Sequence, residues 1–231
     1  MLKSLLNTGL EARLTPEQYA LYRAELITLE ESWKQSLHFL NCDFTFNGGV
    51  EPSKIPTPRC QYDYNHIIYD YRTCRELQPG ETLATRHKTM ADGGTVPCAL
   101  SSVLEYYRHT AKLTVLGQIL VKNGYRTENN GTLLIALDKV PELVYGVQTQ
   151  VQSFIFDIFE SVCMGKPVIA LVSAAWLHAL STMPSNECIV IWRLEEKTAL
   201  ITTTSHHSVR RIDLYDLLKN IKRAWSCQKI D

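Results

Sequence analysis

The order of two hydrophobic patterns is the feature that most constrains the fold of this chain. Between residues 97 and 164, apolar residues recur at steps of three and four, the period of an amphipathic helix. After Pro167 the pattern changes to short apolar runs rich in β-branched residues, which are typical of strands. Helices first and strands afterwards predict an α+β protein.

The same patterns predict where the individual elements lie. A strand is also expected in the aromatic, β-branched run at 62–71, and Asp213 is expected to cap a closing helix whose apolar face extends from Leu214 to Trp225. The remaining helices are expected at 97–107, 113–122, 132–145 with a break or kink at Pro141, and 153–164; the remaining strands are expected at 168–172, 188–194 and 199–204.

The first 60 residues are predicted to be a helical extension and linker, with the main domain at 61–231. The sequence Thr15-Pro16-Glu17-Gln18 is typical of a helix start, and the helix is expected to end near Asn41. Residues 47–58, with two glycines and three prolines, predict a linker or irregular loop. The helix must bury its apolar stripe against the main core or against a second copy, which would make a homo-oligomer. The stripe consists of Tyr22, Leu26, Leu29, Trp33, Leu37 and Leu40.

Charge and hydropathy exclude several classes of partner. The 24 Lys and Arg residues balance the 24 Asp and Glu residues, so there is no electrostatic case for binding nucleic acid or an anionic membrane. Residues 1–14 lack the apolar core of a secretory signal, and no apolar stretch is long enough for a membrane span. A cytoplasmic protein is expected.

The cysteines do not form a recognisable framework. There are seven, an odd number with irregular spacing, and no Cys-x-x-Cys pair occurs. The adjacent pair His206-His207 lacks a third ligand nearby in the sequence. The sequence therefore predicts no cofactor and no metal site, and mostly buried, reduced thiols.

Six segments occur in the order found in one family. They are Gly94-Thr95-Val96-Pro97 followed by Tyr106-Tyr107; Asn123-Gly124-Tyr125 with Gly131-Thr132 and Tyr145-Gly146; Gly165-Lys166-Pro167-Val168-Ile169; 187–191; 201–204; and 213–225. In this order they resemble the papain-like cysteine peptidases of the bacteriocin-leader-processing, or double-glycine peptidase, group. The resemblance covers residues 85–226 and implies a papain-like fold, with a central helix packed on an antiparallel sheet.

The catalytic residues of that family are replaced. The resemblance places Thr95 at the nucleophilic Cys, Glu187 at the His and Thr203 at the orienting Asp, and residues 88–94 lack the Gln of the oxyanion hole. A Thr without a base is a poor nucleophile, and a carboxylate does not replace imidazole at neutral pH without a large pKa shift. The resemblance therefore implies an inactive homologue that binds a peptide or partner protein through the former active-site cleft.

Simpler roles exist for these residues, and one enzymatic alternative stays open. Thr95 is most simply a group that satisfies free amides at the helix start, Glu187 a solvated carboxylate and Thr203 an ordinary strand residue. The alternative is a cysteine hydrolase that uses Cys98, one turn after Thr95, with His178 as its base. Against it, Cys98 lies in an apolar helix, where a thiol is usually inert.

Overall fold

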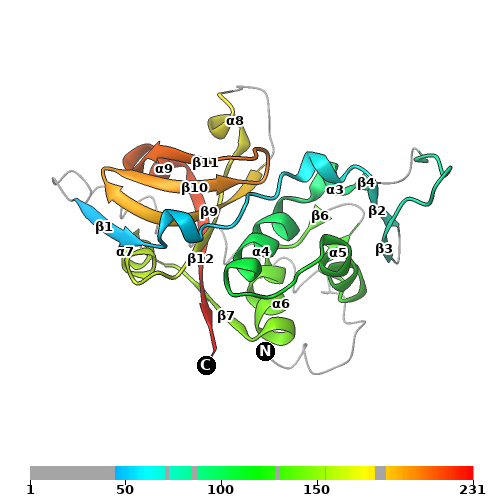
Figure 1. Cartoon of the computed structure of the whole chain (residues 1–231), viewed down its shortest axis with the longest axis horizontal. Coiled ribbons are helices and arrows are strands. Elements are labelled where there is room, and N and C mark those ends of the chain that lie inside the picture. Colours follow the sequence, from blue (N-terminus) through cyan, green and yellow to red (C-terminus); the bar gives the residue numbers. More distant parts are fainter. Residues whose placement is uncertain are drawn as a thin grey trace, which may run out of the picture.

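The computed structural model describes residues 45–230 except 71–72, 85–87, 128–130, 154 and 180–185. Within these residues the chain is a mixed α+β structure with antiparallel sheets, as the sequence predicts. The large sheet lies on one side of the molecule, and helices α4 (Thr95–Tyr106), α5 (Leu113–Lys122) and α6 (Ile135–Tyr145) gather on the other (Figure 1). None of the described helices combines the length and apolar character that a membrane span requires.

Seven strands form the large sheet, in the order β11-β10-β9-β8-β12-β7, with β1 paired to β9. Every neighbouring pair is antiparallel. The three predicted strands at 168–172, 188–194 and 199–204 are therefore confirmed as neighbours. The strands are β1 (Phe46–Gly49), β7 (Val147–Val151), β8 (Val168–Ser173), β9 (Asn186–Glu196), β10 (Thr198–Thr203), β11 (Val209–Asp213) and β12 (Ile221–Lys229).

Helices cover both faces of this sheet. Because side chains alternate along a strand, Ile169 of β8 belongs to the apolar cluster that contains α4, whereas Ala170 belongs to the cluster on the opposite face. The second cluster is formed with α7 (Ile155–Cys163) and α9 (Leu214–Asn220). The central strands are consequently buried on both sides, which explains their continuous apolar runs.

The helical side carries smaller β-structures. A three-stranded sheet has the order β3-β2-β4, and a short two-stranded sheet joins β5 and β6. The bounds are β2 (Ile67–Asp70), β3 (Thr73–Glu76), β4 (Lys88–Thr89), β5 (Arg126–Thr127) and β6 (Gly131–Thr132); short helices are α3 (Met90–Gly93), α8 (Ala174–Leu177), and the 3-10 helices η3 (Pro52–Lys54) and η4 (Gln61–Tyr64).

The predicted closing helix is only half right. Asp213 does cap α9, because its side chain accepts a hydrogen bond from the backbone N–H of Asp216 at 2.9 Å. The helix ends at Asn220, however, and the chain continues directly into β12 between β8 and β7. Residues Ile221 and Trp225 therefore lie on a strand, and the helix-like spacing that joined them to Leu214 was misleading.

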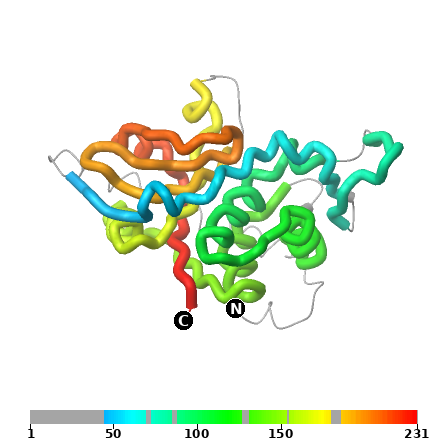
Figure 2. The backbone as a smooth tube through the Cα atoms, in the orientation of Figure 1, coloured from blue at the N-terminus to red at the C-terminus, as the bar shows by residue number. Residues whose placement is uncertain are grey.

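The predicted linker also contains a strand. Residues 46–49 pair with β9, and the backbone N–H of Val50 donates to Trp192 O at 2.8 Å. Val50 is buried in the cluster with α4. Beyond it the chain runs from the sheet side across to the helical side (Figure 2). The expected helix at 15–41 and its apolar stripe lie outside the described residues.

Gly117 marks a close approach of α5 to the small sheet. A Cβ atom there would overlap Cys74 Sγ of β3 and lie 3.2 Å from Tyr69 Cε1 of β2. We expect Gly117→Ala to lower the free energy of unfolding by about 1–3 kcal/mol. This overpacking outweighs the roughly 1 kcal/mol by which Ala favours a helix over Gly. Urea denaturation followed by circular dichroism measures the difference.

The matched control for this substitution is the Cys74→Ala background. There the overlapping sulfur is absent, so Gly117→Ala is expected to destabilise the protein by a smaller amount. An equal loss in both backgrounds would show that the sulfur is not the cause. An unchanged or raised stability of the single variant would contradict the close packing of α5 on β3.

Candidate functional site

Thr95, the first residue of α4, joins the helix to two strands of the large sheet. Its Oγ1 accepts a hydrogen bond from the backbone N–H of Cys188 at 2.6 Å and lies 2.9 Å from Thr204 Oγ1. These partners belong to β9 and to the residue just after β10, so the Thr95 side chain does not satisfy the free amides of its own helix. It links the helix start to the beginning of β9 and the end of β10 instead.

Glu187, the second residue of β9, is buried and fully engaged. Its side chain is only 7% exposed. Carboxylate oxygen Oε1 accepts from the backbone N–H of Thr204 at 3.0 Å, from the Thr204 hydroxyl at 3.1 Å and from the Ser205 hydroxyl at 2.8 Å. The other oxygen, Oε2, lies 2.8 Å from His178 Nε2. The expectation that a strand-start carboxylate is solvated is wrong here, because the turn after β10 and the turn after α8 both close over it.

These contacts determine which hydroxyl group donates and which accepts in each hydrogen bond. Thr204 has one hydroxyl proton and gives it to the Glu187 carboxylate, so Thr95 must donate its own proton to Thr204. A continuous chain of hydrogen bonds thus runs from Thr95 through Thr204 to Glu187 and on to His178. Thr95 is a donor to Thr204 and an acceptor from Cys188 N–H, which leaves its oxygen little capacity to attack a substrate.

Thr203 belongs to the same cluster through the following turn. Its Oγ1 lies 3.2 Å from His206 Nδ1, and Ser205 Oγ lies 2.9 Å from the same nitrogen. The ring of His206 stacks on that of His178, with centroids 5.5 Å apart. Burial lowers the pKa of His206, and the positive charge of Arg210 lowers it further, so this imidazole is neutral at neutral pH.

The structure therefore brings Thr95, Glu187 and Thr203 into one hydrogen-bonded cluster at the start of α4. It adds Thr204 and Ser205, which the sequence did not single out as site residues, and His206, which the sequence suggested only as a metal ligand together with His207. We call these six residues and His178 the Thr95 network. Within the described residues, no imidazole forms a hydrogen bond with Thr95 Oγ1. The hydrogen bonds hold the start of α4 against the sheet, but they place no base next to the Thr95 hydroxyl.

A thiol does lie beside Thr95, but it belongs to β9. Cys188 is buried, and burial raises the pKa of its thiol to about 12. At neutral pH this sulfur is protonated and therefore a weak nucleophile.

Cys98 and His178 do not form a nucleophile and base pair. Cys98 is fully buried in the cluster between α4 and the sheet, and burial raises the pKa of its thiol well above the usual range. Activated cysteines have lowered pKa values, so this shift is in the opposite direction. His178 contacts Glu187, and among the described residues no hydrogen bond joins it to Cys98.

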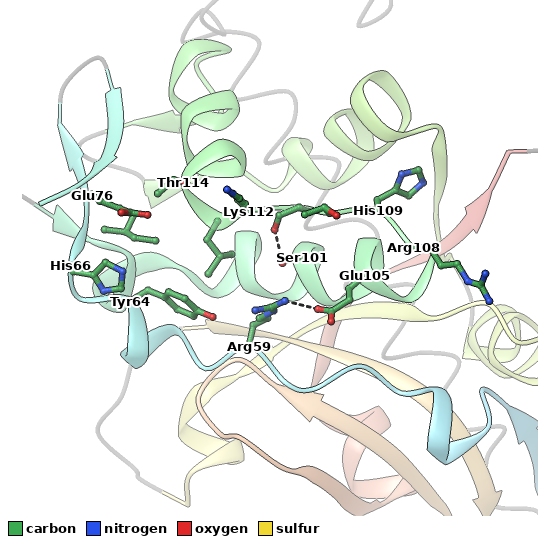
Figure 3. Close-up of a pocket in the computed structure, with 14 residues that line it drawn as sticks. Arg59, Tyr64, His66, Glu76, Ser101, Glu105, Arg108, His109, Lys112 and Thr114 are labelled. Carbon is green, nitrogen blue, oxygen red and sulfur yellow. Dashed lines mark hydrogen bonds and ion pairs between the residues drawn. The ribbon is translucent and has the colours of Figure 1, made fainter.

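A pocket of about 500 Å³ lies along α4 beyond the Thr95 network (Figure 3). His66 and Glu76 stand at one end of it, and Arg108 and His109 stand at the other. Between them, an ion pair of 2.6 Å joins Arg59 to Glu105 of α4. Three formal positive charges, those of Arg59, Arg108 and Lys112, line the pocket against the two negative charges of Glu76 and Glu105.

Residues with metal-ligand chemistry meet beside this pocket. Cys60, Asp63 and His207 offer a thiol, a carboxylate and an imidazole, and their ligand atoms all lie within 4.8 Å of one another. His207 is one residue from His206 of the Thr95 network. The sequence indicated only the pair His206-His207 and predicted no metal site, because Cys60 and Asp63 lie more than a hundred residues before His207.

No known family model matches the chain, and no curated protein is significantly similar to it.

Proposed function

We propose that this chain is a non-catalytic homologue of the papain-like peptidases, and that it binds an extended peptide or a partner protein. The observation that carries the proposal is the state of Thr95. Its hydroxyl stands at the start of the central helix, where the resemblance expects a thiolate, and is held between Cys188 N–H and Thr204. A buried carboxylate, Glu187, stands where the resemblance expects the base.

The chemistry of the Thr95 network supports a structural role for these positions. Covalent catalysis needs a nucleophile whose proton a nearby base can remove. Here the Thr95 proton points to another hydroxyl, and the Glu187 carboxylate already accepts hydrogen bonds from three donors. Binding a chain and breaking a bond use different groups, so a groove can remain useful after the nucleophile is lost.

The pocket along α4 is the surface best suited to such a ligand. Its volume of about 500 Å³ is that of a typical ligand pocket. Ser101 lines it, and at about 1.5 Å per helical residue Ser101 lies roughly 9 Å along α4 from Thr95. The pocket therefore lies on the same helix as Thr95, one to two turns further along. The excess of positive charge favours a peptide with acidic side chains.

The hydrolase alternative receives no support from the positions of its residues. Cys98 is buried with a raised pKa, and His178 is paired with Glu187. Both would have to leave their present contacts to form a nucleophile and base pair.

A binding assay with a cleavage readout tests the proposal. The probe is a fluorescein-labelled peptide that carries several Asp and Glu residues before an internal Gly-Gly pair. We expect saturable binding by fluorescence polarisation and intact peptide by mass spectrometry after long incubation. Lys112→Glu, which reverses a charge at the pocket, should weaken binding about tenfold, equivalent to about 1.4 kcal/mol.

Lys229→Glu is the matched control, since it makes the same charge change at an exposed side chain at the end of β12 that does not line the pocket. It should leave the affinity within about twofold. Absence of binding, or an equal effect of both variants, would reject this pocket as the binding surface. Cleavage at the Gly-Gly pair would overturn the non-catalytic assignment.

A further inference from the structure

Cys60, Asp63 and His207 come from two distant parts of the chain. Cys60 immediately precedes the 3-10 helix η4, Asp63 lies within it, and His207 lies in the turn between β10 and β11. Their ligand atoms lie within 4.8 Å of one another, and His207 Nε2 is 3.5 Å from Asp63 Oδ1. None of the three residues belongs to the Thr95 network, and none of them lines the pocket.

Backbone hydrogen bonds hold the two parts together independently of the side chains. The N–H of Gln61 donates to Thr204 O at 2.7 Å, which fixes η4 against the end of β10. The N–H of Asp63 donates to Cys60 O at 3.2 Å and closes the turn. Cys60 is the N-cap residue of η4, and this turn brings its thiol and the Asp63 carboxylate within 4.8 Å of each other. The backbone thus presents the thiol and the carboxylate toward His207.

The donor set is that of a zinc site. Thiolate, imidazole and carboxylate are the ligands that Zn²⁺ takes, whereas Mg²⁺ and Ca²⁺ take oxygen ligands. Bond lengths of about 2.0–2.3 Å in a tetrahedral site place the ligand atoms roughly 3.3–3.8 Å apart. The ligand atoms must therefore approach one another by about 1.5 Å at most. The side chains of Asp63 and His207 are 50% and 66% exposed, so they are free to rotate toward the buried Cys60 thiol.

We propose that Cys60, Asp63 and His207 bind Zn²⁺. Three protein ligands leave the fourth position to water, as in zinc sites that keep an open position. The ion fastens η4 to the turn after β10, where His206 joins the Thr95 network. The proposal does not rest on the peptide-binding function, because its ligands and its readout differ from those of the pocket.

Cobalt binding tests the site in the full chain. After treatment with a chelator, the protein is titrated with Co²⁺ under reducing conditions and followed by absorbance. We expect one equivalent to bind with the ultraviolet charge-transfer band of a cobalt–thiolate bond and the visible bands of a four-coordinate ion. Added Zn²⁺ should abolish these bands. In the absence of cobalt, Zn²⁺ should raise the thermal midpoint of unfolding.

The variants separate this site from the other thiols of the chain. Cys60→Ser should remove the charge-transfer band, and His207→Ala and Asp63→Asn should remove the stoichiometric binding and the zinc-induced rise in thermal midpoint. The last two change exposed side chains, so folding is expected to survive in them even if Cys60→Ser fails to fold. Cys163→Ser and His66→Ala, which change an exposed thiol and an exposed imidazole elsewhere, should bind cobalt as the parent does.

Two results would overturn the proposal. One is a parent protein that shows no saturable charge-transfer band. The other is a band that survives in both folded variants, His207→Ala and Asp63→Asn, because cobalt would then bind to other thiols.

Discussion

Glu187→Ala should unfold this protein at a much lower urea concentration than the parent requires. The variant removes an acceptor of the Thr204 N–H, the Thr204 hydroxyl and the Ser205 hydroxyl, and removes the partner of His178. Donors that lose their acceptor in a buried site carry the full cost of desolvation. By analogy with breaking a buried ion pair, the loss in the free energy of unfolding is about 3–5 kcal/mol.

Two controls show that the effect belongs to the Thr95 network. Glu160→Ala removes an exposed carboxylate on α7 and should change stability by no more than about 0.5 kcal/mol. Glu187→Gln keeps one oxygen acceptor and nearly the same shape, so it should be destabilised less than Glu187→Ala. A small effect of Glu187→Ala would mean that the carboxylate is solvated after all, as the sequence alone suggested.

Trp225→Ala should cause a loss of similar size, for a reason that concerns packing. Trp225 is 0% exposed and lies on β12, opposite Val151 of β7 and Ile169 of β8. Its Nε1 donates to Asp138 Oδ1 of α6 at 2.6 Å. Truncation of a buried Trp to Ala typically costs about 3–5 kcal/mol, because it removes apolar burial and leaves a cavity.

Urea denaturation of Trp225→Ala and Leu143→Ala measures this contribution. The Leu143 side chain is 66% exposed, so its truncation should change the free energy of unfolding by about 0.5 kcal/mol at most. If Trp225→Ala were equally mild, Trp225 could not lie at the centre of the sheet, and the assignment of 221–229 to a strand would fail.

The sequence predicts the central elements because their local patterns agree with their burial. The run at 168–172 is apolar throughout and is buried on both faces as β8. The helix at 113–122 ends at Asn123-Gly124, and Gly124 indeed has a positive φ of 69°. In both cases a single local rule is sufficient to define the element.

Local rules fail where tertiary contacts decide. Leu214, Leu217 and Ile221 are spaced like one face of a helix, yet the chain extends at Ile221 because two partner strands are available to it. The strand at 46–49 contains two glycines and is stabilised by its pairing with β9, which no pattern in residues 45–60 reveals.

Only the part of the candidate site that the order of motifs identifies could be predicted from the sequence. That order singled out Thr95, Glu187 and Thr203, and the structure brings all three into one cluster. The partners of these residues were not predictable, because a run of threonines at the end of a strand carries no signal of its own. The function of the cluster is a proposal that the peptide-binding experiment tests.

The position of β12 has a consequence for synthesis and folding. The strand pairs with β8 on one side and β7 on the other, and the ribosome makes it after both. Until residues 221–229 are released, two strand edges that carry apolar side chains remain without a partner. Such edges invite pairing with other chains, so we expect a folding intermediate that lacks β12 to be prone to aggregation.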